Sequence, residues 1–551
     1  MIYPKIPLAQ SIIELCLAKG VTQIIISPGS RNAPLTVGFA SNPDFQCYSI
    51  ADERCAAFFA LGIAQQTAKP VALVCTSGSA LLNYYPAIAE AFYSQIPLIV
   101  IAADRPQSKI DIGDGQTIRQ ENVFANHSLY NANLTEENFE QNNFEINEAI
   151  NTAIAQKGPV HINAPFEEPL YETTTELSVT VSAFAKDPIV VAVSDIEDCA
   201  LHWNKAKKKL ILIGVNAPNS IDEAIIETWA EDPSVIVMTE TTSNVHHPSF
   251  IHNIDTIITP FKSVDFESFQ PDILITFGGM IVSKRIKAFL RTYAPQQHWH
   301  VDSLRAYDTF GALTKHIQTS PKLFFNSFIP LTQKTESDYF QMMDTLAILR
   351  KQKTADYLAK ISFSDFKVFD QVISALPSNS QLQISNSSAI RYAQLIKIHP
   401  SIEVFCNRGT SGIDGSTSTA IGAAVANTKQ TTLITGDISF LYDSNGLWNN
   451  YIPKNFKIIL INNGGGGIFR ILPGHQETEL FNTFFETSHQ YTAEHLAKMF
   501  GFDYQLADSE ERLEGGLKAL FAKNEKPSIL EIITPTVDND KILLQFFKDL
   551  E

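Results

Sequence analysis

KIILINNGGGG, residues 457–467, is an apolar run of strand-forming residues that ends abruptly in two asparagines and four glycines. The same pattern, an apolar run followed by a Gly-, Ser-, Asn- or Asp-rich loop, recurs at residues 23–30, 71–79, 98–106, 210–214, 273–278 and 432–437. Apolar residues are continuous in these runs rather than alternating, which is typical of strands buried on both faces of a parallel sheet. With helical stretches between the runs, the sequence predicts an α/β fold with doubly wound parallel sheets.

The length of the chain predicts more than one domain. It has 551 residues, and a single hydrophobic core stops growing at roughly 250–300 residues. A Thr-rich stretch at residues 167–182 and a polar, helical stretch at residues 331–367 interrupt the strand pattern. We therefore predict three α/β domains: an N-terminal domain at residues 1–182, a central domain at 183–350 and a C-terminal domain at 351–551.

Composition excludes several classes of partner. With 42 basic and 59 acidic residues, the net charge is −17, which argues against nucleic acid or an anionic membrane surface as partner. The apolar run at residues 96–103 ends at Asp104 and is too short to span a bilayer. Six cysteines without a CxxC pair favour free thiols in a reducing compartment. We expect a cytoplasmic protein without a targeting segment, and we interpret KAKKK, residues 205–209, as a solvated helix end.

Two strand ends in the last third of the chain carry oxygen donors. Gly436-Asp437 ends one apolar run, and Asn462-Asn463 ends another. Ligands of parallel sheets bind beyond the carboxyl ends of the strands, and carboxylate, amide and backbone oxygens suit a hard cation such as Mg²⁺. Alternatively, Asp437 caps the following helix and the asparagines form a turn. The sequence has no P-loop, HExxH or EF-hand signature.

The spacing of these donors resembles the thiamin-diphosphate motif, which opens with Gly-Asp-Gly and closes with Asn-Asn, although Ile438 replaces its third residue. Further motifs occur in order along the chain: SPGSRNAPL (27–35), DER (52–54), ADRP (103–106), QTIRQ (116–120), NRGTSGIDG (407–415) and IF (468–469). Together they resemble the thiamin-diphosphate-dependent synthases that form 2-succinyl-5-enolpyruvyl-6-hydroxy-3-cyclohexene-1-carboxylate in menaquinone biosynthesis, in which Gly-Asp-Leu/Ile is the rule. This resemblance covers the whole chain and implies three domains of the thiamin-diphosphate enzyme type.

The resemblance implies a cofactor site in the C-terminal domain. Its metal, Mg²⁺ or Mn²⁺, would be bound by the side chains of Asp437 and Asn463 and by the carbonyl of Gly465. Thiamin diphosphate would also contact Gly436, Ser439, Ile468 and Ile413, the last as a wedge that bends the cofactor. Glu53 would bond the aminopyrimidine ring and assist removal of the proton from the reactive carbon, which requires a shifted pKa. Without the resemblance, Glu53 fits better as an exposed acid in a first helical turn, and Ile413 fits ordinary core packing.

The implied reaction has two dicarboxylate substrates. The enzyme, a transferase, would decarboxylate 2-oxoglutarate and add the succinyl unit to isochorismate in a 1,4 sense. Guanidinium groups suit carboxylates better than ammonium groups do. The matching positions imply substrate contacts from Ser30, Arg31, Arg105, Gln116, Lys284, Arg391, Arg408, Phe469 and Leu472, with Arg31 and Gln116 as further catalytic candidates beside Glu53. Each arginine, taken singly, also fits a surface ion pair.

The resemblance also implies self-association, because in the superfamily the glutamate and the diphosphate site come from different subunits. We therefore expect a homodimer or homotetramer. Two alternative functions stay open. Another thiamin-diphosphate 2-oxoacid decarboxylase or carboligase would need a smaller or more apolar acceptor pocket. A non-catalytic protein with this fold would not need Glu53, Asp437 and Asn463, which are all present.

Overall fold

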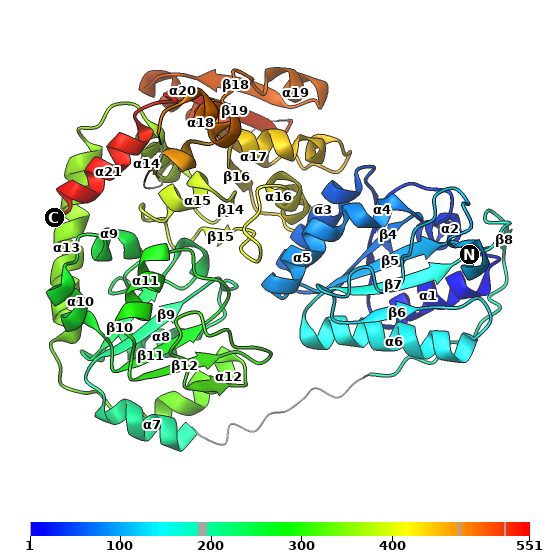
Figure 1. The fold of residues 1–551 in the computed structure, drawn as a ribbon, viewed down its shortest axis with the longest axis horizontal. Coiled ribbons are helices and arrows are strands. Elements are labelled where there is room, and N and C mark those ends of the chain that lie inside the picture. The colour runs from blue at the N-terminus through cyan, green and yellow to red at the C-terminus, as the bar shows by residue number, and fades with distance from the viewer. Residues whose placement is uncertain (1, 186–195, 472–473, 475, 523–524) are drawn as a thin grey trace.

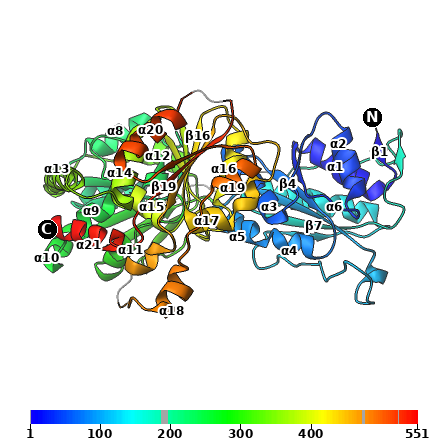
Figure 2. The same ribbon diagram turned by 90° about the horizontal axis from the view of Figure 1, so that it is seen from above.

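The computed structural model describes residues 2–185, 196–471, 474, 476–522 and 525–551. Three large parallel sheets follow one another along the chain, each with helices on both faces (Figures 1 and 2). The prediction of three doubly wound α/β domains is therefore confirmed. The positions of the domain boundaries remain a prediction, and one helix, α13 (Tyr339–Leu358), runs through residue 350. Within the described ranges no helix has the length and apolar character needed to cross a membrane.

The N-terminal sheet has the strand order β3-β2-β4-β5-β7-β6. Its strands are β2 (Gln23–Ile26), β3 (Gln46–Ser49), β4 (Val71–Cys75), β5 (Leu98–Asp104), β6 (Asn131–Asn133) and β7 (Val160–Pro165). Its helices are α1 (Pro7–Ala18), α2 (Ala33–Ser41), α3 (Glu53–Thr67), α4 (Ser79–Asn83), α5 (Tyr85–Ser94) and α6 (Phe139–Gln156). Two short strands, β1 (Tyr3–Pro4) and β8 (Thr173–Thr174), pair separately. Alternate residues of β2, β4 and β5 pack into apolar clusters on opposite faces, which explains their continuous apolar sequences.

The central sheet has the order β10-β9-β11-β12-β13. Its strands are β9 (Lys209–Ile213), β10 (Val235–Thr239), β11 (Ile273–Phe277), β12 (Gln297–Val301) and β13 (Lys315–Ile317). Its helices are α7 (Ile196–Lys205), α8 (Glu223–Ala230), α9 (Ile254–Ile258), α10 (Ser263–Phe269), α11 (Lys284–Thr292) and α12 (Pro321–Phe328). The interpretation of residues 205–209 as a solvated helix end is wrong for Lys209. This lysine is fully buried at the start of β9, and its Nζ lies 3.3 Å from Asp232.

The C-terminal sheet has the order β15-β14-β16-β17-β19-β18 and so repeats the connectivity of the N-terminal sheet. Its strands are β14 (Gln381–Ile384), β15 (Glu403–Phe405), β16 (Thr431–Gly436), β17 (Phe456–Asn462), β18 (Asp503–Ala507) and β19 (Ser528–Ile533). Its helices are α14 (Asp365–Ala375), α15 (Ser388–Ala393), α16 (Ser416–Val425), α17 (Asp437–Tyr442), α18 (Glu479–Phe481), α19 (Glu494–Met499), α20 (Glu510–Leu520) and α21 (Asn539–Asp549). In both sheets the chain reverses its direction of travel after the second strand, which is the point where doubly wound folds bind ligands.

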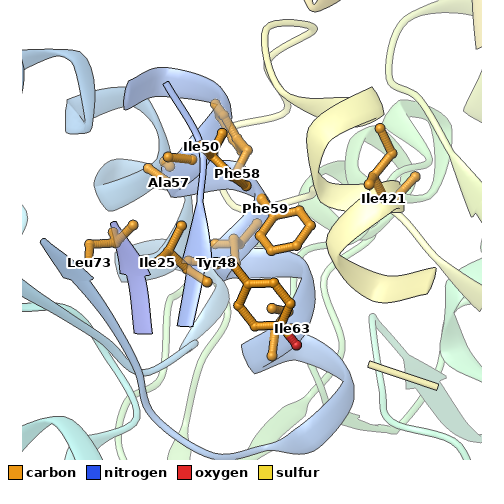
Figure 3. Packing of buried hydrophobic residues seen from close by; sticks show 14 of the residues in the cluster. Ile25, Tyr48, Ile50, Ala57, Phe58, Phe59, Ile63, Leu73 and Ile421 are labelled. Carbon is orange, nitrogen blue, oxygen red and sulfur yellow. The ribbon is translucent and has the colours of Figure 1, made fainter. Parts of the chain in front are cut away.

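The N- and C-terminal domains share one apolar core. Helix α3 packs along α16, and Phe58, Phe59 and Ile63 of α3 belong to the same buried cluster as Ile421 of α16 (Figure 3). The two helices approach closely because a glycine stands at the crossing: a Cβ at Gly62 would overlap the Thr419 carbonyl oxygen. The two outer domains are therefore fixed against each other by a continuous apolar contact.

Candidate active site

A cavity of about 470 Å³ lies at the carboxyl edge of the C-terminal sheet. Most of its lining residues follow β14, β15, β16 and β17, which lie side by side in the sheet. Lys284 and Lys287 of α11, in the central domain, also line the cavity. The strand order reverses at β14 and β16, so the cavity occupies the usual ligand position of an open α/β sheet.

Most predicted site residues of the central and C-terminal domains line this cavity: Lys284, Arg391, Arg408, Ile413, Gly436, Asp437, Ser439, Asn463, Gly465, Ile468 and Phe469. Leu472 lies outside the described residues. The N-terminal candidates Ser30, Arg31, Glu53, Arg105 and Gln116 are not among the residues that line the cavity. The structure thus divides the predicted site into two groups.

Asp437 and Asn463 have the surroundings expected of oxygen ligands. The two carboxylate oxygens of Asp437 accept hydrogen bonds from the N–H groups of Ile438, at 2.7 Å, and Gly465, at 2.9 Å. The Asn463 amide nitrogen donates to Asp365 at 2.9 Å, so its oxygen remains available to a ligand. The N-cap of α17 is Gly436 and not Asp437, so helix capping does not account for this carboxylate.

A hard divalent cation fits these donors. A carboxylate, an amide oxygen and the backbone carbonyl of Gly465 are the ligand types that Mg²⁺ and Mn²⁺ take in proteins. A Cβ at Gly465 would lie 2.8 Å from the Glu486 carbonyl oxygen, so only glycine allows this close approach of two loops. Across the described ranges there is no group of three or more His, Cys, Asp or Glu side chains that could hold a metal.

The loop at residues 407–413 is held firmly beside the cavity. Asn386 donates its amide hydrogens to the carbonyls of Asn407 and Gly412, each at 2.7 Å. Arg408 donates to the Asn386 oxygen at 2.7 Å, and the Ser439 hydroxyl donates to the Ile413 carbonyl at 3.0 Å. Ile413 is half-buried and lines the cavity, so it does not belong to the fully buried core.

Four cationic side chains line the same cavity: Lys284, Lys287, Arg391 and Arg408. Burial and the positive charge of Arg408 lower the pKa of Arg391. Burial also lowers the pKa of Lys287, where nearby Glu240 acts in the opposite direction and Arg408 adds to the lowering. Like charges held together in a partly desolvated cavity are stabilised when an anion binds among them.

Lys287, Asp365 and His489 are site residues that the sequence analysis missed. Lys287 lies one helical turn after Lys284, so its i,i+3 spacing could have predicted a shared face. Asp365 orients Asn463 from 98 positions away in sequence, and no local pattern announces such a contact. His489 Nε2 lies 3.3 Å from Asp437 Oδ2. Its Nδ1 accepts from the Tyr491 N–H at 3.1 Å, so in the neutral ring Nε2 carries the proton and faces the carboxylate.

The N-terminal candidates gather at the carboxyl edge of their own sheet. Arg31 and Arg105 follow β2 and β5, and Glu53 follows β3. Arg31 is buried and donates to the Phe166 carbonyl at 3.0 Å and to the exposed Glu168 carboxylate at 3.2 Å. Arg105 lies 3.7 Å from Asp114. These arginines therefore have ion-pair partners in this structure, and each partner carboxylate is at the surface.

Ser30 and Gln116 lie on exposed loops of this edge. The backbone of Gln116 has a positive φ of 56° and packs against Gly78, which follows β4. Their contacts with substrate stay predictions.

Glu53 begins α3 at the contact between the outer domains. Its two neighbours both reach the C-terminal domain: Asp52 accepts from Asn445 at 2.9 Å, and Arg54 donates to the Tyr442 carbonyl at 2.8 Å. Burial is the main cause of a raised Glu53 pKa, to which the adjacent Asp52 also contributes. Within a single chain, the Glu53 carboxyl thus lies at the contact with the C-terminal domain, which carries the cavity. That two subunits share the site stays a prediction.

Comparisons with known proteins agree with this geometry. Residues 6–128 match the thiamine pyrophosphate enzyme N-terminal TPP binding domain, residues 192–384 the middle domain of thiamine pyrophosphate enzymes, and residues 387–532 the C-terminal TPP binding domain. Similar proteins named 2-succinyl-5-enolpyruvyl-6-hydroxy-3-cyclohexene-1-carboxylate synthase occur in Flavobacterium johnsoniae (68% identical), Flavobacterium psychrophilum (68%) and Christiangramia forsetii (52%). These alignments cover 99–100% of this chain and of each relative. The chain belongs to this synthase family. The cavity and the edge of the N-terminal sheet that carries Glu53 therefore belong to a thiamine pyrophosphate enzyme.

Proposed function

We propose that this chain is a transferase that decarboxylates 2-oxoglutarate with thiamin diphosphate and adds the succinyl unit to isochorismate. The product is 2-succinyl-5-enolpyruvyl-6-hydroxy-3-cyclohexene-1-carboxylate, in menaquinone biosynthesis. The observation that carries the proposal is one cavity in which oxygen donors suited to a metal lie beside four cationic side chains. Full-length similarity to synthases of that name supports it.

Residues of the cavity would contact both the diphosphate end and the ring end of the cofactor. Asp437, Asn463 and Gly465 would hold Mg²⁺ or Mn²⁺ against the diphosphate. Apolar side chains beside them, Ile413 and Ile468, would contact the rings. When bound, thiamin diphosphate supplies a nucleophilic carbon that accepts a 2-oxo acid and delocalises the charge left when carbon dioxide departs.

Glu53 is the proposed proton-handling group. Burial raises the pKa of this carboxyl, and a general acid works best when its pKa is close to the working pH. Placed at the domain contact, this carboxyl would hold a proton beside the aminopyrimidine ring and pass it on in each cycle.

The cations are the proposed substrate-binding groups. Each substrate has two carboxylates, and Lys284, Arg391 and Arg408 would bind them within the cavity. From the N-terminal edge, Arg31 and Arg105 would add contacts after exchanging their carboxylate partners, Glu168 and Asp114, for substrate, because both partner side chains are exposed and can turn toward solvent. Neutral hydrogen bonds would come from Ser30 and Gln116, and Phe469 would supply an apolar wall.

The proposal includes self-association as a homodimer or homotetramer and a cytoplasmic location. Support for a reducing compartment comes from the six cysteines, five of them buried, which are not joined in disulfides. Light scattering after size-exclusion chromatography measures the assembly directly.

Product identification tests the reaction. With 2-oxoglutarate, isochorismate, Mg²⁺ and thiamin diphosphate, mass spectrometry should detect the succinylated ring product, and omission of any one component should abolish it. Turnover of pyruvate or another 2-oxo acid with no use of isochorismate would show instead a different thiamin-diphosphate decarboxylase or carboligase. Absence of all turnover by the folded, cofactor-loaded protein would favour a non-catalytic role.

The variant Glu53→Gln tests the proton-handling role. We expect cofactor affinity to stay within about threefold, while decarboxylation of 2-oxoglutarate slows by about 100-fold or more. Glu511→Gln, on an exposed turn of α20, is the control and should match the unmodified enzyme. Unchanged turnover in Glu53→Gln would remove this carboxyl from the mechanism.

A further inference from the structure

We propose that Glu90, in α5 of the N-terminal domain, is a positioning residue for the loop at residues 407–413 of the C-terminal domain. This loop carries Arg408 and Ile413, so the functional consequence rests on the roles proposed for those two residues. The Glu90 carboxylate holds the loop in place from across the domain boundary and thereby sets the position of a substrate-binding cation and of a cofactor contact.

The contacts of Glu90 are directed at the loop backbone. The carboxylate is 1% exposed. One oxygen accepts from the Gly409 N–H at 2.7 Å, and the other accepts from the Thr410 N–H at 2.6 Å and from the Thr410 hydroxyl at 2.9 Å. Ser94, one turn further along α5, donates to the first oxygen at 2.7 Å. Two consecutive backbone N–H groups on one carboxylate fix the orientation of that peptide segment.

Glu90 has no ion-pair partner among the described residues, so these donors alone offset its burial. A buried carboxylate that lacks donors is strongly destabilised. The loop therefore has one favourable position, in which it donates to this carboxylate. Gly409 can occupy that position because it lacks a side chain: a Cβ there would lie 2.5 Å from the Glu90 carbonyl oxygen and 2.8 Å from Ser94 Oγ.

The rest of the loop is held by its own domain. Asn386 binds the carbonyls of Asn407 and Gly412, and Ser439 binds the carbonyl of Ile413. Residues 409 and 410, between these anchors, are held by the N-terminal domain. Loss of Glu90 would free the segment that joins Arg408 to Ile413 while leaving its ends attached.

The experiment uses Glu90→Gln in the full chain, since the amide keeps the size but turns one acceptor into a donor that faces N–H groups. Hydrogen exchange, measured without cofactor or substrate, should be at least tenfold faster for the peptide covering residues 409–410. KM for the dicarboxylate substrates should rise at least tenfold with a smaller change in kcat, and the Kd for thiamin diphosphate with Mg²⁺, measured by calorimetry, should rise as well.

The control is Gln66→Ala, which removes a side-chain hydrogen bond to Gln381 in the same domain contact, away from the loop. It should leave the exchange of residues 409–410, KM and Kd unchanged. Thr410→Val, which removes only the hydroxyl donor, should give a smaller effect of the same kind and decides the matter if Glu90→Gln does not fold. Unchanged exchange at residues 409–410, or equal KM effects in Gln66→Ala, would overturn the proposal. Faster exchange with unchanged KM and Kd would overturn the roles of Arg408 and Ile413 instead.

Discussion

At the scale of single residues, the first turn of α11 goes against a local rule. It contains Lys284, Arg285 and Lys287 and no acidic residue, although cations at a helix N-terminus oppose the helix dipole. Both lysines line the cavity. Departures from local preference concentrate at functional sites, so we assign the unfavourable charge to the binding of anionic substrate.

Lys287→Met tests this assignment. We expect KM for one dicarboxylate substrate to rise about tenfold or more, since a charged hydrogen bond contributes about 1.5–3 kcal/mol, with little change in kcat. Stability should rise slightly, by about 0.3–1 kcal/mol, because an unfavourable dipole contact is removed. Steady-state kinetics and thermal unfolding measure both, with the exposed Lys351→Met of α13 as control. A fall in stability with unchanged KM would show that Lys287 has only a structural role.

His161, in β7, should make the free energy of unfolding depend on pH. Burial lowers its pKa from 6.5 to about 3, and neither ring nitrogen has a hydrogen-bond partner among the described residues. Below pH 6.5 the unfolded chain takes up a proton that the folded chain does not, so this residue costs stability progressively as pH falls toward 3. His161→Leu should therefore gain on the unmodified protein by up to about 1.4 kcal/mol per pH unit below 6. Urea unfolding at pH 7.5 and pH 5 measures the difference, and a pH-independent difference would contradict the prediction.

Residues were predictable where a local pattern carried the signal. Asp437 and Asn463 stand directly after apolar runs, and the structure places both on one cavity. Lys209 was misread because a run of lysines resembles a solvated helix end, whereas Asp232, 23 positions later, partners it inside the sheet. No local pattern indicated the role of Glu90, because its partners Gly409 and Thr410 lie 319 and 320 positions away in the sequence.

At the scale of elements, the strands were predictable and the helix contacts were not. Strands buried on both faces have a composition that is visible locally. The crossing of α3 and α16 depends instead on shape, and the sequence showed no more than a glycine within each helix. Gly62 and Gly422 let two backbones meet, and this crossing brings the Glu53 end of α3 to the cofactor-binding domain.

Gly62→Ala tests the crossing. Its added Cβ would overlap the Thr419 carbonyl oxygen, and backbone cannot move aside as a flexible side chain can, so we expect a loss of about 1–3 kcal/mol of stability. Gly515→Ala in α20 is the matched control, because its Cβ would meet open space, and it should gain about 0.5–1 kcal/mol. Chemical unfolding measures both free energies. If both variants gained stability, α3 and α16 would not pack as closely as described.

At the scale of the whole molecule, net charge and site charge are separate properties. The chain has a net charge of −17, yet Lys284, Lys287, Arg391 and Arg408 converge on one cavity. The net charge argued against a polyanion partner, but it could not locate this cluster, which combines residues of two domains. The fold concentrates cations where the carboxyl edge of the C-terminal sheet meets α11 of the central domain, and the metal would neutralise the diphosphate beside them.

Because the two outer domains share a core, we expect cofactor binding to stabilise both of them and not only the domain that holds the cofactor. Thiamin diphosphate with Mg²⁺ at 100 times its Kd should add about 2.7 kcal/mol to the free energy of unfolding. The cluster around Phe59 and Ile421 joins both outer domains. Hydrogen exchange measured separately in β4 of the N-terminal domain and in β17 of the C-terminal domain should therefore report the same gain in the free energy of unfolding. A chelator should abolish it. Asp437→Ala should show no gain even with excess metal, whereas the exposed Asp503→Ala should behave as the unmodified chain does. An undiminished gain in Asp437→Ala would refute the metal assignment, and a gain confined to β17 would show that the two domains unfold independently.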